Sequence, residues 1–168
     1  MKYKSEKGQV SIEFIFLISI SIILSIAILN FIASESEIDI ALLAGKNGIN
    51  EGIIIDSSAI YPTNTFNEYS LEKPNLLKAN SIKLDKITIR NSQFDLKYNK
   101  TRIQLQVYVI SDVITEKKDQ DSLGDRINYN LRKSISQTFN TENLSNSLYN
   151  PSYSKNYIFT TADVVWIK

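Results

Sequence analysis

Cysteine and histidine are both absent from this chain of 168 residues. Their absence excludes disulfide bonds, zinc–thiolate sites, cysteine nucleophiles and Ser-His-Asp triads. An enzyme built from this sequence would have to work with carboxylates, lysines or hydroxyl groups alone. No motif that carries a catalytic mechanism occurs, so we expect no enzymatic activity and no cofactor or metal site.

A strong charge of either sign is also missing. The chain has 19 Lys and Arg residues against 18 Asp and Glu residues, which gives a formal net charge of +1. Because no basic block offers a surface to a phosphate backbone, we do not expect nucleic acid as a partner. The acids at Glu116, Asp119, Asp121 and Asp125 are interpreted as part of a solvated polar loop.

One long apolar run lies near the N-terminus. From Phe14 to Ala33 about twenty residues carry no charge, and as a helix they would span roughly 30 Å, the thickness of a bilayer's hydrocarbon core. Lysines precede the run and acids follow it, which predicts a cytoplasmic N-terminus and an extracytoplasmic remainder. These flanking charges are Lys2, Lys4, Lys7, Glu35, Glu37 and Asp39.

Two ordinary kinds of membrane segment contain an apolar run near the N-terminus. A secretory signal has an apolar core of about 7–15 residues and small residues before its cut, whereas this run is longer and Phe31 occupies a position that should be small. A permanent single-pass anchor explains the length, and its account of Glu13 is a side chain that snorkels toward the cytoplasmic headgroups. A membrane-anchored extracytoplasmic binding domain therefore stays as an alternative.

The residues just before the apolar run suggest a third kind. Lys7–Phe14 reads KGQVSIEF, and this segment resembles the class III signal peptide of archaeal type IV pilins, in which a basic residue and a glycine precede Q-x-S-x-E, an aromatic residue and an apolar helix. The resemblance implies that a prepilin peptidase cuts between Gly8 and Gln9 and leaves the apolar helix on the mature chain. Lys7 and Ser11 belong to the context of that cut.

The resemblance also implies a role for Glu13. In type IV pilins this glutamate is the assembly carboxylate, which meets the N-terminal amine of an adjacent subunit. A cut before Gln9 creates an amine four residues ahead of Glu13, on the same helical face or within reach of a neighbouring subunit. Archaeal flagellins usually lack this glutamate, so the segment favours a pilus over an archaellum.

The function implied by the resemblance is a structural subunit, with a minor one favoured, of an archaeal type IV pilus-like surface filament. Its partners would be the prepilin peptidase and other pilin subunits, in a homo- or hetero-polymer. The chain would reside in the cell membrane before assembly and in an extracellular filament at the cell surface afterwards. A pseudopilin of a secretion or uptake system is a further alternative.

The helical spacing continues beyond the apolar run. A stripe from Ile38 to Ile53 recurs at steps of three and four, which predicts a helix to about Ser58 that Tyr61-Pro62 then stops. Ser34 could begin a capping box that restarts the helix. Three glycines are weak points in it: Gly45, Gly48 and Gly52.

From about residue 82 the spacing changes to two. Alternation predicts antiparallel strands over 82–89, 94–98 and 103–109, with a bulge inside the first and short turns RNSQ and NKT between them. A short amphipathic helix is expected from Ile127 to Phe139, and a final strand over 157–168. The expected fold is α+β: a long N-terminal hydrophobic helix followed by an antiparallel β-rich globular head with a short helix.

The expected organisation has three segments. A leader covers residues 1–8, the long helix covers 9–60, and the extracytoplasmic head covers 61–168. Two N-x-S/T sequons lie in the head, so Asn99 and Asn143 are candidate acceptors for N-glycosylation.

Overall fold

The computed structural model describes residues 6–58, 71 and 81–167. By the contacts among its residues the chain divides into two units, residues 1–38 and residues 39–168. The second half of the long helix therefore belongs with the sheet and the other helices, whereas the first half makes up a unit of its own.

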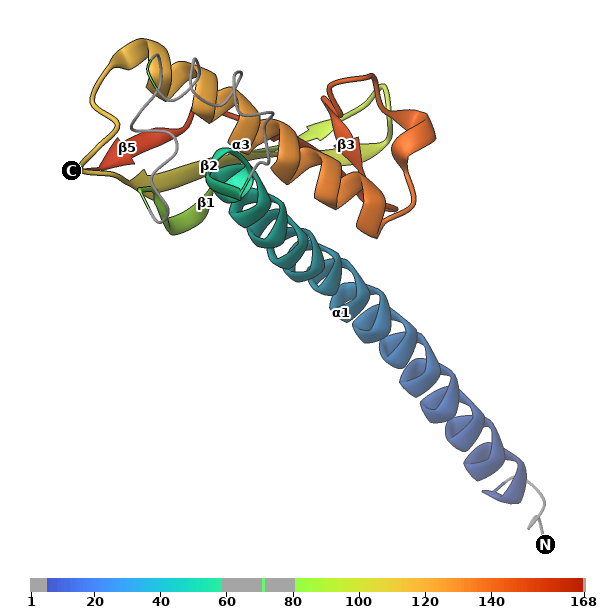
Figure 1. The fold of residues 1–168 in the computed structure, drawn as a ribbon. Helices are drawn as coiled ribbons and strands as arrows, with labels where there is room; N and C mark the ends of the chain where they lie inside the picture. The colour runs from blue at the N-terminus through green and yellow to red at the C-terminus, as the bar shows by residue number, and fades with distance from the viewer. Residues whose placement is uncertain (1–5, 59–70, 72–80, 168) are drawn as a thin grey trace, which may run out of the picture. The chain divides into compact units, whose positions relative to one another are not determined.

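Helix α1 runs from Glu6 to Ser58 (Figure 1). The helix expected to about Ser58 is confirmed. Every residue of this range is helical, so no restart occurs at Ser34. The expected stop at Tyr61-Pro62 lies outside the described residues.

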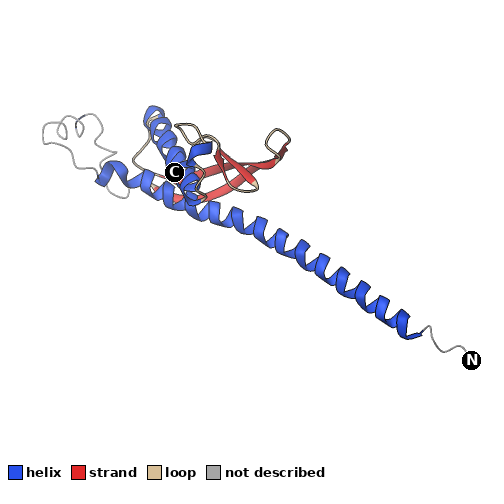
Figure 2. Ribbon diagram, turned by 90° about the vertical axis from the view of Figure 1, so that its right-hand side faces the viewer, coloured by secondary structure: helices blue, strands red, loops and turns tan. Residues whose placement is uncertain are grey.

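The head contains one five-stranded sheet (Figure 2). Its order is β1-β2-β4-β3, and β5 pairs with β2 as well. The strands are β1 (Lys83–Asp95), β2 (Lys100–Ile110), β3 (Ser152–Tyr153), β4 (Tyr157–Thr161) and β5 (Val165–Ile167). Strand β2 is central, and the alternating residues predicted to face the core are its buried apolar ones: Ile103, Leu105, Val107 and Val109.

The prediction of a wholly antiparallel sheet was wrong. The pairs β1/β2 and β3/β4 are antiparallel, but β2 pairs in parallel with both β4 and β5. Helix α3 (Lys117–Thr138) follows β2 and carries the chain across the sheet, as parallel neighbours require. The expected final strand is two strands, β4 and β5, separated by residues 162–164. The N–H of Ala162 donates to the Leu105 carbonyl at 2.9 Å.

The first hairpin also differs from the prediction. RNSQ is not a turn but the middle of β1, and the chain reverses at residues 96–99, just before NKT was expected to turn it. The predicted bulge is confirmed between Leu84 and Lys86, and a second register shift follows between Ile89 and Asn91. Because a bulge shifts the alternation by one residue, in sequence it resembles the end of one strand and the start of another.

Helix α3 confirms the predicted amphipathic helix and begins earlier than expected, at Lys117. Its stripe of Ile127, Leu131 and Ile135 is fully buried, and it packs against β3 and β4. A single turn of 3-10 helix, η1 (Glu142–Leu144), follows it.

The three glycines of α1 are points of close contact with α3. A Cβ added to Gly45 would lie 3.3 Å from Leu131 Cγ, and one added to Gly52 would lie 3.2 Å from Asn130 Nδ2. Ala41, Ala44 and Ile49 are buried beside them. Small residues let two helices approach closely, so these glycines place the second half of α1 on the head.

Candidate functional site: the exposed apolar half of helix α1

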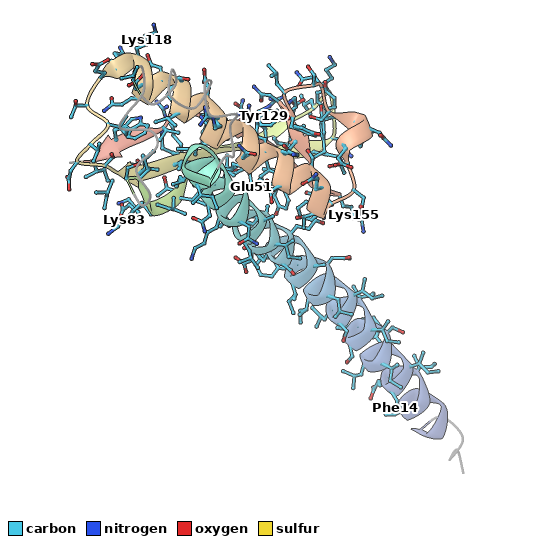
Figure 3. All side chains as sticks on the ribbon, in the orientation of Figure 1. Phe14, Glu51, Lys83, Lys118, Tyr129 and Lys155 are labelled. Carbon is cyan, nitrogen blue, oxygen red and sulfur yellow. The ribbon has the colours of Figure 1, made fainter. Side chains whose placement is uncertain are left out.

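The first half of α1 carries large apolar side chains that are all exposed. Phe14 is 62% exposed, Ile26 55% and Phe31 65%, although each lies on a different side of the helix. Figure 3 shows side chains projecting from this half of the helix, with Phe14 near its start. A surface of this kind is unfavourable in water, so it must be covered by lipid or by other protein.

Within the described residues one helix is long and apolar enough to cross a membrane, over Ile12–Ile54. Its most apolar stretch is not buried within the chain. This property is compatible with anchoring in a membrane.

A shallow hollow of about 480 Å³ runs along one side of this segment. Its walls come from positions spaced three and four residues apart, which share one helical face. Ser21 and Ser25 lie among larger apolar side chains on this face. Because the two serine side chains are small, they leave space that forms the hollow. The other lining residues are Phe14, Leu17, Ile18, Ile22 and Ile26.

The serines of the apolar run hydrogen-bond back to their own helix. Ser19, Ser21 and Ser25 donate to the carbonyl oxygens of Ile15, Leu17 and Ser21 at 2.8, 2.9 and 2.8 Å. Their polar hydrogens are thereby satisfied without water. The same geometry keeps the serine side chains against the backbone, so the hollow beside Ser21 and Ser25 stays apolar.

Glu13 lies at the start of this apolar surface and is exposed. It is the only charged residue between Ile12 and Ser34, and it lies in the second turn of α1, which begins at Glu6.

The bond between Gly8 and Gln9 lies within the helical backbone. Lys7 and Ser11 lie in the same helical stretch, and their side chains are outside the described part of the chain. A protease that binds its substrate in an extended form would need only the first turn of α1 to unwind, because helix ends fray readily.

The two candidate glycosylation acceptors are both exposed in the head. Asn99 lies in the turn between β1 and β2, where its φ is +50°, and Asn143 lies in η1. Tyr98 contacts the Tyr153 ring of β3 with 6.0 Å between centroids, and η1 also packs on β3. The two sequons therefore lie at the same end of the head.

One feature of the head was missed by reasoning from the sequence. Asp121 and Asp125 do not lie in a solvated loop but on α3, four residues apart, where they line a hollow of about 380 Å³ with Trp166 of β5. Helical spacing could have placed the two acids on one face, but no sequence signal relates α3 to a strand some forty residues later.

Comparisons of this chain with protein-family models, with curated proteins and with solved structures give no match.

Proposed function

We propose that this chain is a structural subunit, and a minor one, of an archaeal type IV pilus-like surface filament. A prepilin peptidase removes residues 1–8, and the mature subunits polymerise through the first half of α1. The observation that carries the proposal is the segment KGQVSIEF directly ahead of a helix whose apolar side chains are exposed on every side.

The exposed apolar side chains of this helix need to be kept from water both before and after assembly. Lipid covers it before assembly, and the helices of neighbouring subunits cover it afterwards, so the same apolar surface serves both states. The hollow beside Ser21 and Ser25 would receive a side chain of the next helix, as a knob enters a hole. Glu13 would meet the new amine of an adjacent chain, since a carboxylate removed from water needs a partner.

The deciding experiment is mass spectrometry of the N-terminus of the chain recovered from the cell surface. We expect the mature chain to begin at Gln9 when the prepilin peptidase is present. In a matched variant, Gly8→Val, the chain should stay uncut. Glycine has no Cβ and therefore fits a tight protease site, whereas the branched side chain of valine does not. A wild-type surface chain that still begins at Met1 or Lys2 contradicts the proposal and supports a permanent anchor.

The other alternative needs a second measurement. A pseudopilin of a secretion or uptake system would be cut at the same bond but would not form surface filaments. Immunolabelling of surface filaments against the head separates the two. Label along or at the tip of filaments supports the pilus subunit, whereas a cut chain found only in the membrane supports the pseudopilin.

A further inference from the structure

The end of the head that carries β5 has two adjoining hollows, of about 380 and 500 Å³. The first lies between α3 and the segment that joins β4 to β5, and the second lies between the residues after β2 and β5. Gln120 and Trp166 line both, so the two hollows meet at these side chains. Trp166 is the only tryptophan of the chain and is partly exposed.

The first hollow has an excess of hydrogen-bond acceptors. Asp121, Asp125 and Asp163 line it, and within the described part of the chain no hydrogen bond or ion pair engages their carboxylates. Lys117 is the one cation of the lining, so three aspartates and one lysine give the hollow a net charge of −2. A ligand here must donate hydrogen bonds and must not carry negative charge.

The amides of the lining are held in place by the head itself. Gln120 Nε2 donates to the Ile114 carbonyl at 2.9 Å, and Asn128 Nδ2 donates to the Ala162 carbonyl at 2.9 Å. Asn128 is only 7% exposed, and its Oδ1 has no hydrogen-bond partner among the described residues. A buried amide oxygen without a partner is rare in folded proteins, and a ligand or bound water commonly satisfies such an atom.

We propose that these hollows form a binding site for a short saccharide without negative charge, with amino sugars bound most tightly. Sugar hydroxyls supply the hydrogen-bond donors that the three carboxylates and Asn128 Oδ1 lack, and an ammonium group is attracted by the net charge of the hollow. The indole of Trp166 offers an apolar face to a sugar ring and attracts a cation. The volume of the hollows falls in the usual range for small-molecule sites.

A metal ion is a less suitable occupant. Among the described residues no group of three or more acidic side chains is arranged to hold one. The carboxylates are instead spread over α3 and the segment before β5, a spacing that suits a ligand with several separate hydroxyl groups. This proposal does not depend on filament assembly, so the two can fail independently.

The test is a titration of Trp166 fluorescence in the full chain, reconstituted in lipid nanodiscs so that no sugar-based detergent competes. Because the chain has one tryptophan, the signal reports on this site alone. We expect the β-1,4-linked glucosamine disaccharide to give a saturable change with a Kd in the millimolar range. Glucuronic acid should bind at least tenfold more weakly, because it adds a negative charge.

Three results would overturn the proposal. The first is that no neutral or amino sugar gives a saturable change in fluorescence. The second is that glucuronic acid binds as tightly as the disaccharide. The third is that propylammonium, which has the positive charge but lacks the hydroxyl groups, binds as tightly as the disaccharide. Calcium chloride is titrated as well, and tighter binding of calcium than of the disaccharide would assign the site to a metal ion instead.

Variants locate the binding within the head. Asp163→Asn and Asp125→Asn should each weaken the disaccharide at least fivefold, since each removes a charged acceptor. Asp85→Asn is the matched control, because Asp85 is an exposed acid on β1 that lines neither hollow. Circular dichroism of each variant checks that it folds, and unchanged affinity in both folded site variants would contradict the assignment.

Discussion

Gly48 of α1 lies directly against the backbone of Asn130 in α3: a Cβ added to the glycine would be 2.3 Å from the Asn130 carbonyl oxygen. Real Cβ atoms essentially never come so close to another heavy atom, and a backbone carbonyl cannot move aside as a flexible side chain can. The contact fixes how closely the second half of α1 approaches α3.

The first prediction concerns this contact. Gly48→Ala should lower the free energy of unfolding of the head by about 1–3 kcal/mol, the usual effect of overpacking, although alanine is the better helix former. Urea unfolding of the full chain in nanodiscs, followed by circular dichroism, measures it. Gly124→Ala is the matched control, because its new Cβ would meet Val164 Cβ at an ordinary 3.5 Å. Equal unfolding free energies for the two variants would argue against a tight contact at Gly48.

The second prediction concerns the hairpin of β1 and β2. Arg102 Nη2 donates to Asp95 Oδ2 at 2.6 Å, and the Lys97 N–H donates to Asp95 Oδ1 at 3.0 Å. The hydrogen bond from Arg102 is the main reason that the pKa of Asp95 is lowered from 3.8. The ionised carboxylate therefore contributes stability above pH 3.8, and this contribution is lost as the pH falls through the lowered pKa.

The measurement for this hairpin is the Tm of the head as a function of pH. Wild-type Tm should fall more steeply below pH 3.8 than the Tm of Asp95→Asn, which has no carboxylate to protonate. High salt should reduce the difference, because the pair is partly exposed to solvent. Parallel curves for the two chains would show that Asp95 adds no pH-dependent stability.

The third prediction concerns Glu13 and depends on the proposed function. Glu13→Ala should leave membrane insertion and the cut at Gly8-Gln9 unchanged, while incorporation into filaments falls at least tenfold. The reason is that an amine removed from water without its carboxylate is strongly destabilised. Quantitative immunoblots of sheared filaments measure incorporation, and Glu35→Ala, which removes an exposed acid beyond the apolar run, is the control. Normal incorporation of Glu13→Ala would favour the snorkelling account.

The fourth prediction concerns the hollow on the apolar helix. Ser21→Leu fills it and should block filament assembly, because a neighbouring helix can no longer insert a side chain there. Ser19→Leu is the matched control. It also replaces a serine that hydrogen-bonds to a carbonyl of its own helix, but Ser19 does not line the hollow. Both variants should insert into the membrane normally. Filament yields that are reduced equally would point to a general effect of added bulk.

Local patterns in the sequence predicted the local structure well. The alternation from Ile103 to Val109 gave the buried face of β2, and the helical stripe through Ile127 gave α3, because each pattern records which side of a single element meets the core. The apolar run likewise predicted the exposed first half of α1, whereas the interpretation of KGQVSIEF as a processing signal stays a prediction.

Contacts between elements that are far apart in the chain could not be predicted from the sequence. The residues of β4 and β5 do not predict that both strands pair in parallel with β2, because the direction of these strands depends on the path of α3, which connects β2 to them. Gly48 was interpreted as a weak point because its partner, Asn130, is far away in sequence. The hollows at Trp166 were missed for the same reason.

The parallel pairing of β2 also has a consequence for how the head is made. One edge of β2 pairs with β1 at once, but its other edge waits for β4 and β5, which follow about 50 residues later. At about 5–20 residues per second, synthesis of that interval takes roughly 3–10 seconds. Throughout that time a strand whose side chains will be buried has an open edge, so the emerging chain is most exposed to mispairing just before its sheet is completed.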